Sequence, residues 1–117
     1  MSRVNALILR PLGSVDGCPC SLEDDFIENS AECLHEIVGD GLEFGMPFPD
    51  LDPRIVAIVG ETSVFTEPCV FEGQFQPWWG TIVFLRRDGS ELRSLTAIEK
   101  QILMTLLPQL GNIRFRE

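Results

Sequence analysis

Three cysteines and the single histidine lie close together in the first third of the chain: Cys18, Cys20, Cys33 and His35. Thiolate and imidazole groups are the ligands that zinc prefers in proteins. The spacing disfavours zinc, because Cys-Pro-Cys is tighter than the pairs of structural zinc sites. If residues 22–38 form a helix, Cys33 and His35 differ by about 200° around its axis and cannot share one ion. A metal site here is therefore a minor hypothesis, and no cofactor is expected.

Cys18 and Cys20 also allow a redox interpretation. Cys20 directly precedes the expected helix start at Ser21, where the helix dipole would stabilise a thiolate. Acidic residues at 23–25 would repel the same thiolate. An inert loop pair and a thiol or metal site both stay open for these cysteines.

Sequence motifs that would indicate an enzyme are missing from the chain. No glycine-rich phosphate loop, no serine nucleophile elbow and no zinc-protease motif occurs in the 117 residues. His35 has no nucleophile beside it on the expected helix face, so surface solvation is its expected role. These observations favour a non-enzymatic function.

An aromatic cluster offers a candidate ligand site. The segment Phe75-Gln76-Pro77-Trp78-Trp79 places two tryptophans side by side. Neighbouring residues of a strand point to opposite faces, so one Trp can enter the core while the other faces out. With Phe75 and Met46, Trp78 and Trp79 predict an apolar pocket between the sheet and a loop, suited to a small apolar or cationic ligand.

The strongest sequence feature is the distribution of charge. The chain has a net charge of −9, and no Lys or Arg occurs between Arg10 and Arg54, where 11 of the 18 acidic residues lie. A helix over 22–38 would carry one uniformly acidic face, formed by Asp24, Asp25, Glu28, Glu32 and Glu36. Like charges four residues apart destabilise a helix, which favours a basic partner for this face. Nucleic acid is excluded as a partner because phosphates need a basic surface.

The expected elements start with a strand at 3–10, followed by a helix from about 22 to 38 that begins at Ser21 and ends at Gly39. Strands are expected at 55–59, 64–71 and 113–115. Asp88-Gly89 predicts a type I′ hairpin between strands at 81–87 and 90–95. Thr96 and Glu99 form a capping box that opens a helix over 97–108.

Together these elements predict one α+β domain spanning residues 1–117. Its sheet would be mostly antiparallel, with about five to six strands and both helices packed on one face. No apolar run is long enough for a membrane helix, and no secretory signal is recognised, so a cytoplasmic protein with reduced thiols is expected.

The leading functional hypothesis is a non-enzymatic interaction module of the inhibitor, immunity or adaptor type, which presents the acidic helix face to a basic protein. The alternatives are a small-ligand-binding domain built on the aromatic cluster and, less favoured, a cysteine-based metal or redox site. An edge strand and an exposed Trp would also favour pairing into a homodimer.

Overall fold

The computed structural model describes residues 2–116. In this range the chain forms nine strands and three helices. The strands are β1 (Arg3–Pro11), β2 (Cys20–Glu28), β3 (Leu42–Gly45), β4 (Ile55–Gly60), β5 (Cys69–Glu72), β6 (Pro77–Trp79), β7 (Ile82–Asp88), β8 (Glu91–Arg93) and β9 (Ile113–Arg116). The helices are α1 (Ala31–Val38), α2 (Ser63–Thr66) and α3 (Ala97–Leu110).

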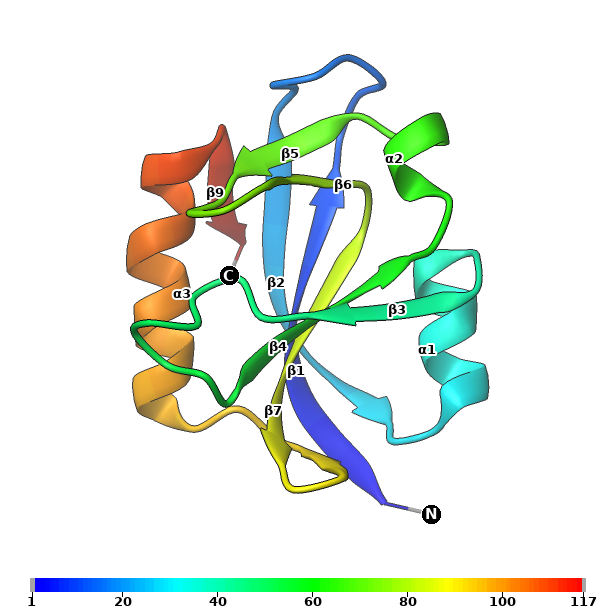
Figure 1. Cartoon of the computed structure of the whole chain (residues 1–117), viewed down its shortest axis with the longest axis vertical. Coiled ribbons are helices and arrows are strands. Elements are labelled where there is room, and N and C mark those ends of the chain that lie inside the picture. Colours follow the sequence, from blue (N-terminus) through cyan, green and yellow to red (C-terminus); the bar gives the residue numbers. More distant parts are fainter. Residues whose placement is uncertain (1, 117) are drawn as a thin grey trace.

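Seven strands form one twisted sheet in the order β3-β4-β7-β1-β2-β9, with β8 paired to the end of β7 (Figure 1). β2 and β9 run parallel, whereas the other pairs in this sheet are antiparallel. β5 and β6 form a separate two-stranded sheet. The predicted α+β class is confirmed, but the sheet is larger than expected and mixed.

The predicted helix over 22–38 is wrong in its first half. Residues Cys20–Glu28 instead form β2, which pairs with β1 along its whole length, from Arg3 opposite Glu28 to Pro11 opposite Cys20. β1 is an apolar strand whose backbone needs hydrogen-bond partners on both edges, and β2 provides the partners on one edge. Only residues 31–38 are helical, and Ser30 rather than Ser21 is the N-cap.

α1 and α3 lie on opposite faces of the sheet, so the prediction that both helices cover one face is also wrong (Figure 1). Leu34 of α1 packs on one face in a core that includes Ile8, Ile58 and Val83. α3, together with β5 and β6, covers the other face, where Leu103 and Leu107 are completely buried. Strands β1, β4 and β7 are therefore buried on both faces, which explains their nearly continuous apolar sequences.

Other elements follow the sequence in part. The hairpin of β7 and β8 is confirmed, but its two-residue turn is Gly89-Ser90, because Asp88 pairs with Glu91. Only Gly89 has a positive φ there, 64°, which matches a type II′ turn and excludes type I′. The expected strand over 64–71 is confirmed only at its end, since α2 occupies its first part and β5 starts at Cys69.

α3 opens with the predicted capping box, in which the Thr96 side chain accepts from Glu99 N and Glu99 accepts from Thr96 N. It extends beyond the expected end, because Pro108 is accommodated in the last turn and the helix continues to Leu110. In the described part of the chain, no helix is both long and apolar enough to cross a membrane.

Candidate functional site

The acidic residues predicted to share one helix face are divided between two elements. Glu32 and Glu36 lie on α1, whereas Asp24, Asp25 and Glu28 lie on β2. The single acidic face of the sequence prediction is therefore not assembled. Its residues remain largely exposed, but they do not form one continuous helical stripe.

Asp24 has partners within the fold. Its carboxylate accepts hydrogen bonds from the Asn5 side chain and from Lys100 Nζ, the latter at 3.0 Å. Partial burial would raise the pKa of Asp24, but the hydrogen bonds from Asn5 and Lys100 and the charge of Lys100 together lower it below its ordinary value. This carboxylate ties α3 to the β1–β2 hairpin and is not free for a partner.

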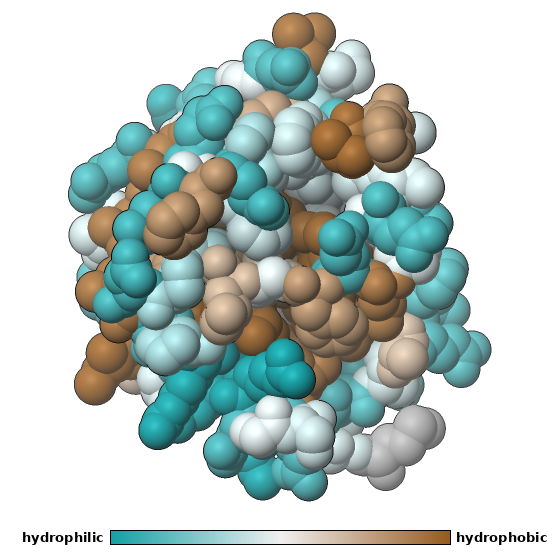
Figure 2. Space-filling view, in the orientation of Figure 1, coloured by the Kyte–Doolittle hydropathy of each residue, from teal (hydrophilic) through white to brown (hydrophobic). Residues whose placement is uncertain are grey.

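The residues of the predicted aromatic site do come together. Two adjoining hollows of about 320 and 190 Å³ lie between β3 and the β5–β6 sheet. We call them the aromatic hollows; residues lining one or both are Glu43, Phe44, Gly45, Met46, Pro47, Gly60, Glu61, Val64, Phe75, Gln76, Trp78 and Trp79. Figure 2 shows apolar side chains gathered around a recess near the centre of the face on which β3 and β6 lie.

Trp78 forms the floor shared by both aromatic hollows. Its side chain is buried and stacks on Phe71, with ring centroids 5.9 Å apart and planes at 12°. Two glycines allow the indole to lie against the backbone. A Cβ at Gly45 would meet Trp78 Cη2 at 2.6 Å, and a Cβ at Gly73 would meet Trp78 Nε1 at 2.6 Å. The position of the ring therefore depends on both residues lacking a side chain.

The rim of the hollows is apolar and exposed. Phe75 is 71% exposed and Met46 is 51% exposed, while Phe44 of β3 is 48% exposed. Trp79, next to the buried Trp78, is only partly buried. Large exposed apolar side chains that gather around a recess are typical of binding surfaces rather than of ordinary solvent-facing regions.

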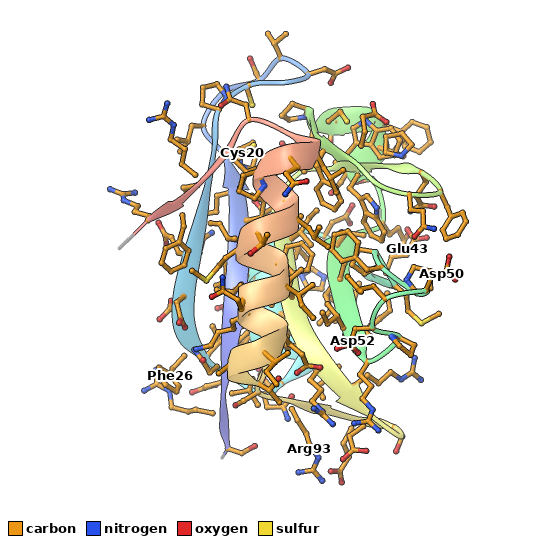
Figure 3. All side chains as sticks on the ribbon, turned by 90° about the vertical axis from the view of Figure 1, so that its left-hand side faces the viewer. Cys20, Phe26, Glu43, Asp50, Asp52 and Arg93 are labelled. Carbon is orange, nitrogen blue, oxygen red and sulfur yellow. The ribbon has the colours of Figure 1, made fainter. Side chains whose placement is uncertain are left out.

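Carboxylates flank this apolar surface. Glu43 and Glu61 line the larger hollow, and the Glu61 carboxylate lies over Gly41, where a Cβ would approach it to 2.9 Å. Asp50 accepts a hydrogen bond from Gln74 Nε2 at 2.8 Å, next to the rim residue Phe75. Figure 3 shows Glu43 and Asp50 on the same side of the molecule, with Phe26 on the opposite side.

Within the described residues, no Lys or Arg forms an ion pair with these carboxylates. No Lys or Arg lines either aromatic hollow. Among the ion pairs found within residues 2–116, none involves Glu43, Glu61 or Asp50. The site thus combines exposed apolar side chains with carboxylates that form no ion pair among residues 2–116, which suits a cation carried on an apolar stem, such as Lys or Arg.

Two of the four cysteines, Cys20 and Cys69, lie in environments that disfavour a reactive thiolate. Cys20 is buried, and burial together with the neighbouring Cys18 raises the pKa of its thiol to about 12. Burial also raises the pKa of Cys69. A nucleophilic thiol needs a lowered pKa, so the environment opposes the redox interpretation.

The metal hypothesis finds no geometric support either. Cys33 and His35 both lie on α1, where Cys33 packs against the core and His35 is exposed. Within residues 2–116, no group of three or more His, Cys, Asp or Glu side chains could hold a metal ion.

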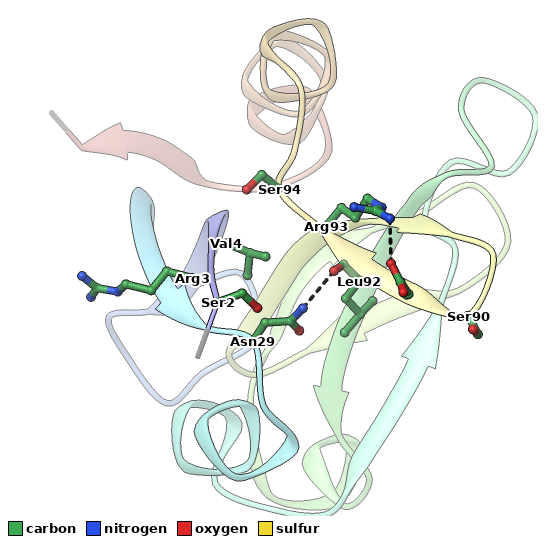
Figure 4. Close-up of a pocket in the computed structure, with 9 residues that line it drawn as sticks. Ser2, Arg3, Val4, Asn29, Ser90, Leu92, Arg93 and Ser94 are labelled. Atoms are coloured by element: carbon green, nitrogen blue, oxygen red, sulfur yellow. Dashed lines mark hydrogen bonds and ion pairs between the residues drawn. The ribbon is translucent and has the colours of Figure 1, made fainter.

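A separate, polar hollow of about 600 Å³ lies between the start of β1 and β8 (Figure 4). Its polar groups are mostly satisfied within the protein: Asn29 Nδ2 donates to Leu92 O at 3.0 Å, and Arg93 pairs with Glu91 at 2.7 Å and with Asp88. The Arg3 side chain points away from the other residues that line the hollow (Figure 4). This hollow shows no converging set of free groups.

Sequence reasoning named Met46, Phe75, Trp78 and Trp79 but missed the other residues that line the hollows, among them Glu43, Phe44, Gly45 and Glu61. Their clearest signal is the alternation Leu42-Glu43-Phe44 followed by glycine, which indicates a short strand with one polar face. Nothing in the sequence indicates that Gly45 would receive an indole ring.

No protein-family model matches the chain, and neither a curated protein nor a solved structure shows significant similarity to it. The functional argument therefore rests on the geometry and charge of the aromatic hollows.

Proposed function

We propose that the protein is a non-enzymatic interaction module that binds a basic partner protein at the aromatic hollows and their acidic rim. The observation that supports this most directly is the union of two tryptophans with Glu43 and Glu61 in one recess that no Lys or Arg lines. The contact surface is thus moved from the helix face expected from sequence to the region between β3 and β6.

The physical basis is complementary charge combined with aromatic surface. A Lys or Arg side chain can lie along the exposed apolar rim while its charged group reaches Glu43 or Glu61. A cation over an indole face gains about 0.5–2 kcal/mol, depending on how far it is desolvated. The net charge of −9 adds long-range attraction for a basic partner.

A small cationic ligand is the second candidate. The volume of about 320 Å³ lies within the range of ordinary ligand pockets, and its lining includes both tryptophans of the chain. A cytoplasmic location is proposed as well, supported by four cysteines that are all free thiols.

Intrinsic fluorescence tests this proposal, because both tryptophans of the chain lie at the aromatic hollows. The probe is an amidated seven-residue peptide that alternates Lys and Val, and its control contains Glu in place of Lys. We expect the Lys peptide to change the emission saturably and the Glu peptide to have no effect. If arginine amide alone binds as tightly as the Lys peptide, the small-ligand candidate is correct instead.

Two charge-reversed variants locate the contact. Glu43→Lys/Glu61→Lys should weaken binding of the Lys peptide by about tenfold or more. Glu28→Lys/Glu32→Lys changes the net charge by the same amount at positions of the acidic face predicted from sequence. Equal weakening by both variants would show that only the overall charge attracts the peptide, and a larger effect of the second would restore the helix-face hypothesis.

A further inference from the structure

The strand that borders the aromatic hollows lies at one end of the seven-stranded sheet. β3 pairs with β4 on one side only. Both Glu43 and Phe44 of β3 line both hollows, so the free edge of the sheet opens directly onto the recess.

The hydrogen-bond register identifies which backbone groups of β3 are free. Glu61 N donates to Gly41 O at 2.7 Å, so Gly41 and Glu61 form a hydrogen-bonded pair next to Leu42 opposite Gly60. Such pairs alternate along an antiparallel ladder, so Glu43 and Gly45 also point their backbone groups toward β4. Leu42 and Phe44 consequently direct their N–H and C=O groups outward.

These outward groups have no other partner in the described part of the chain. No turn, loop or side-chain hydrogen bond to the backbone of Leu42 or Phe44 is found within residues 2–116. An exposed edge with free backbone groups is a template for another strand, and proteins blunt such edges with charged side chains, Pro, short strands or a covering segment. β3, with the sequence Leu-Glu-Phe-Gly, is short and carries one exposed charge, Glu43, which would repel an acidic strand and attract a basic one.

The opposite end of the sheet is protected in the usual way. β9 carries Arg114 and Arg116, both exposed, at alternate positions of a four-residue strand. Positive charges of this kind discourage edge-to-edge association. The two edges therefore differ in the sign of their charge, and only the edge of β3 would attract a basic strand.

We propose that β3 receives an extended basic segment of the partner protein, which adds as a further strand to the sheet. This inference rests on the function proposed above and specifies its mode of binding. The added strand would accept and donate hydrogen bonds at Leu42 and Phe44. Its alternate side chains would pass over the aromatic hollows, where Glu43 and Glu61 favour Lys or Arg.

Charge decides between a partner protein and a second copy of this chain. Pairing two β3 strands would bring two copies of Glu43 into proximity and join two molecules that each carry −9. Like charges across paired strands are destabilising. An extended segment rich in Lys or Arg meets the same surface with attraction.

Backbone methylation of the alternating Lys-Val peptide tests the strand directly. One peptide carries N-methyl groups on all Lys residues and its matched control carries them on all Val residues, so each has one edge without donors. Only one edge of an added strand faces β3. We therefore expect one methylated set to lose at least about tenfold in affinity and the other to bind like the unmodified peptide.

The outcomes separate this inference from the proposed function. If charge reversal at Glu43 and Glu61 weakens binding but both methylated sets bind like the unmodified peptide, strand addition is wrong and the proposed function stands. If the two sets lose affinity equally, strand addition is likewise overturned. If no Lys peptide binds at all, both proposals fail.

Variants of Phe44 test the same edge from the side of the protein. Phe44→Pro removes the outward N–H without breaking a bond to β4, and Phe44→Ala removes only the aromatic side chain. We expect Phe44→Pro to weaken the peptide at least about fivefold more than Phe44→Ala does, with circular dichroism verifying that both fold. Equal affinities of the two variants would contradict the inference. A dimer in sedimentation that Phe44→Pro abolishes, without any peptide binding, would assign the edge to a second copy and overturn it.

Discussion

Replacing Gly45 by Ala should displace Trp78 and destabilise the protein. The added Cβ would lie 2.6 Å from Trp78 Cη2, whereas ordinary van der Waals contact begins at 3.4 Å. The indole would therefore have to withdraw by about 0.8 Å. It cannot do so freely, because the ring is buried, stacked on Phe71 and bordered on another side by Gly73.

The magnitude follows from two opposing effects. Overpacking of a well-filled core costs about 1–3 kcal/mol. Replacing Gly by Ala also restricts the unfolded chain, which stabilises the protein by about 0.4–1 kcal/mol. We expect the free energy of unfolding of Gly45→Ala to fall by about 1–2 kcal/mol.

Urea unfolding followed by far-UV circular dichroism measures this change, and a double-mutant cycle assigns it. Phe at position 78 is shorter than Trp, so Gly45→Ala should cost much less in the Trp78→Phe background, with a coupling energy of about 1 kcal/mol. Gly41→Ala is the matched control, because its Cβ would meet only the flexible carboxylate of Glu61. If Gly45→Ala left the free energy of unfolding unchanged, or if the two substitutions were strictly additive in the cycle, the proposed contact would be refuted.

Two further predictions concern Asp40 and Cys20. Hydrogen bonds from the Thr62 hydroxyl and from the backbone of Gly41 and Thr62 lower the pKa of Asp40. The ionised Asp40 carboxylate therefore stabilises the fold fully above the unfolded pKa of about 3.9, and this stabilisation is lost as pH falls through the lower pKa of the folded state. Asp40→Asn should therefore lower the urea midpoint at about pH 7, with a smaller difference from the unchanged protein at about pH 3; a constant difference would contradict this. Because the pKa of the buried Cys20 is raised to about 12, iodoacetamide should label it last of the four cysteines, and only when unfolding or local opening exposes it, as peptide mass spectrometry can measure. Labelling of Cys20 as fast as that of Cys33 would be inconsistent with the structure.

The segment 20–28 shows where sequence reasoning fails. Its residues Asp24, Asp25 and Phe26 are exposed one after another, so the strand has no alternation of apolar and polar residues to reveal it. Ser21 followed by acidic residues, with Leu22 and Phe26 four positions apart, favours a helix locally, but the tertiary partner β1 determines the conformation. The next suitable cap, Ser30, accepts from Cys33 N at 3.1 Å and begins the shorter helix.

Local rules succeed where the decisive contacts are local. The capping box of Thr96 and Glu99 predicts the start of α3 because both of its hydrogen bonds lie within four residues. The difference in burial between Trp78 and Trp79 is expected for neighbouring residues of a strand. The acidic rim is not predictable in this way, because Glu43 and Glu61 meet only through the pairing of β3 with β4.

The parallel pair of β2 and β9 has a consequence for motion in the native state. β9 joins the sheet through contacts between residues far apart in the sequence, such as Arg116 and Glu23, which are 93 positions apart. Closing so long a loop is entropically costly, and a four-residue strand offers few hydrogen bonds to offset that cost. β9 should therefore open more often than the central strands, and amide exchange would detect it. Because Ile113 of β9 pairs with Cys20, the rate at which the Cys20 thiol becomes reactive would report how often this end of the sheet opens.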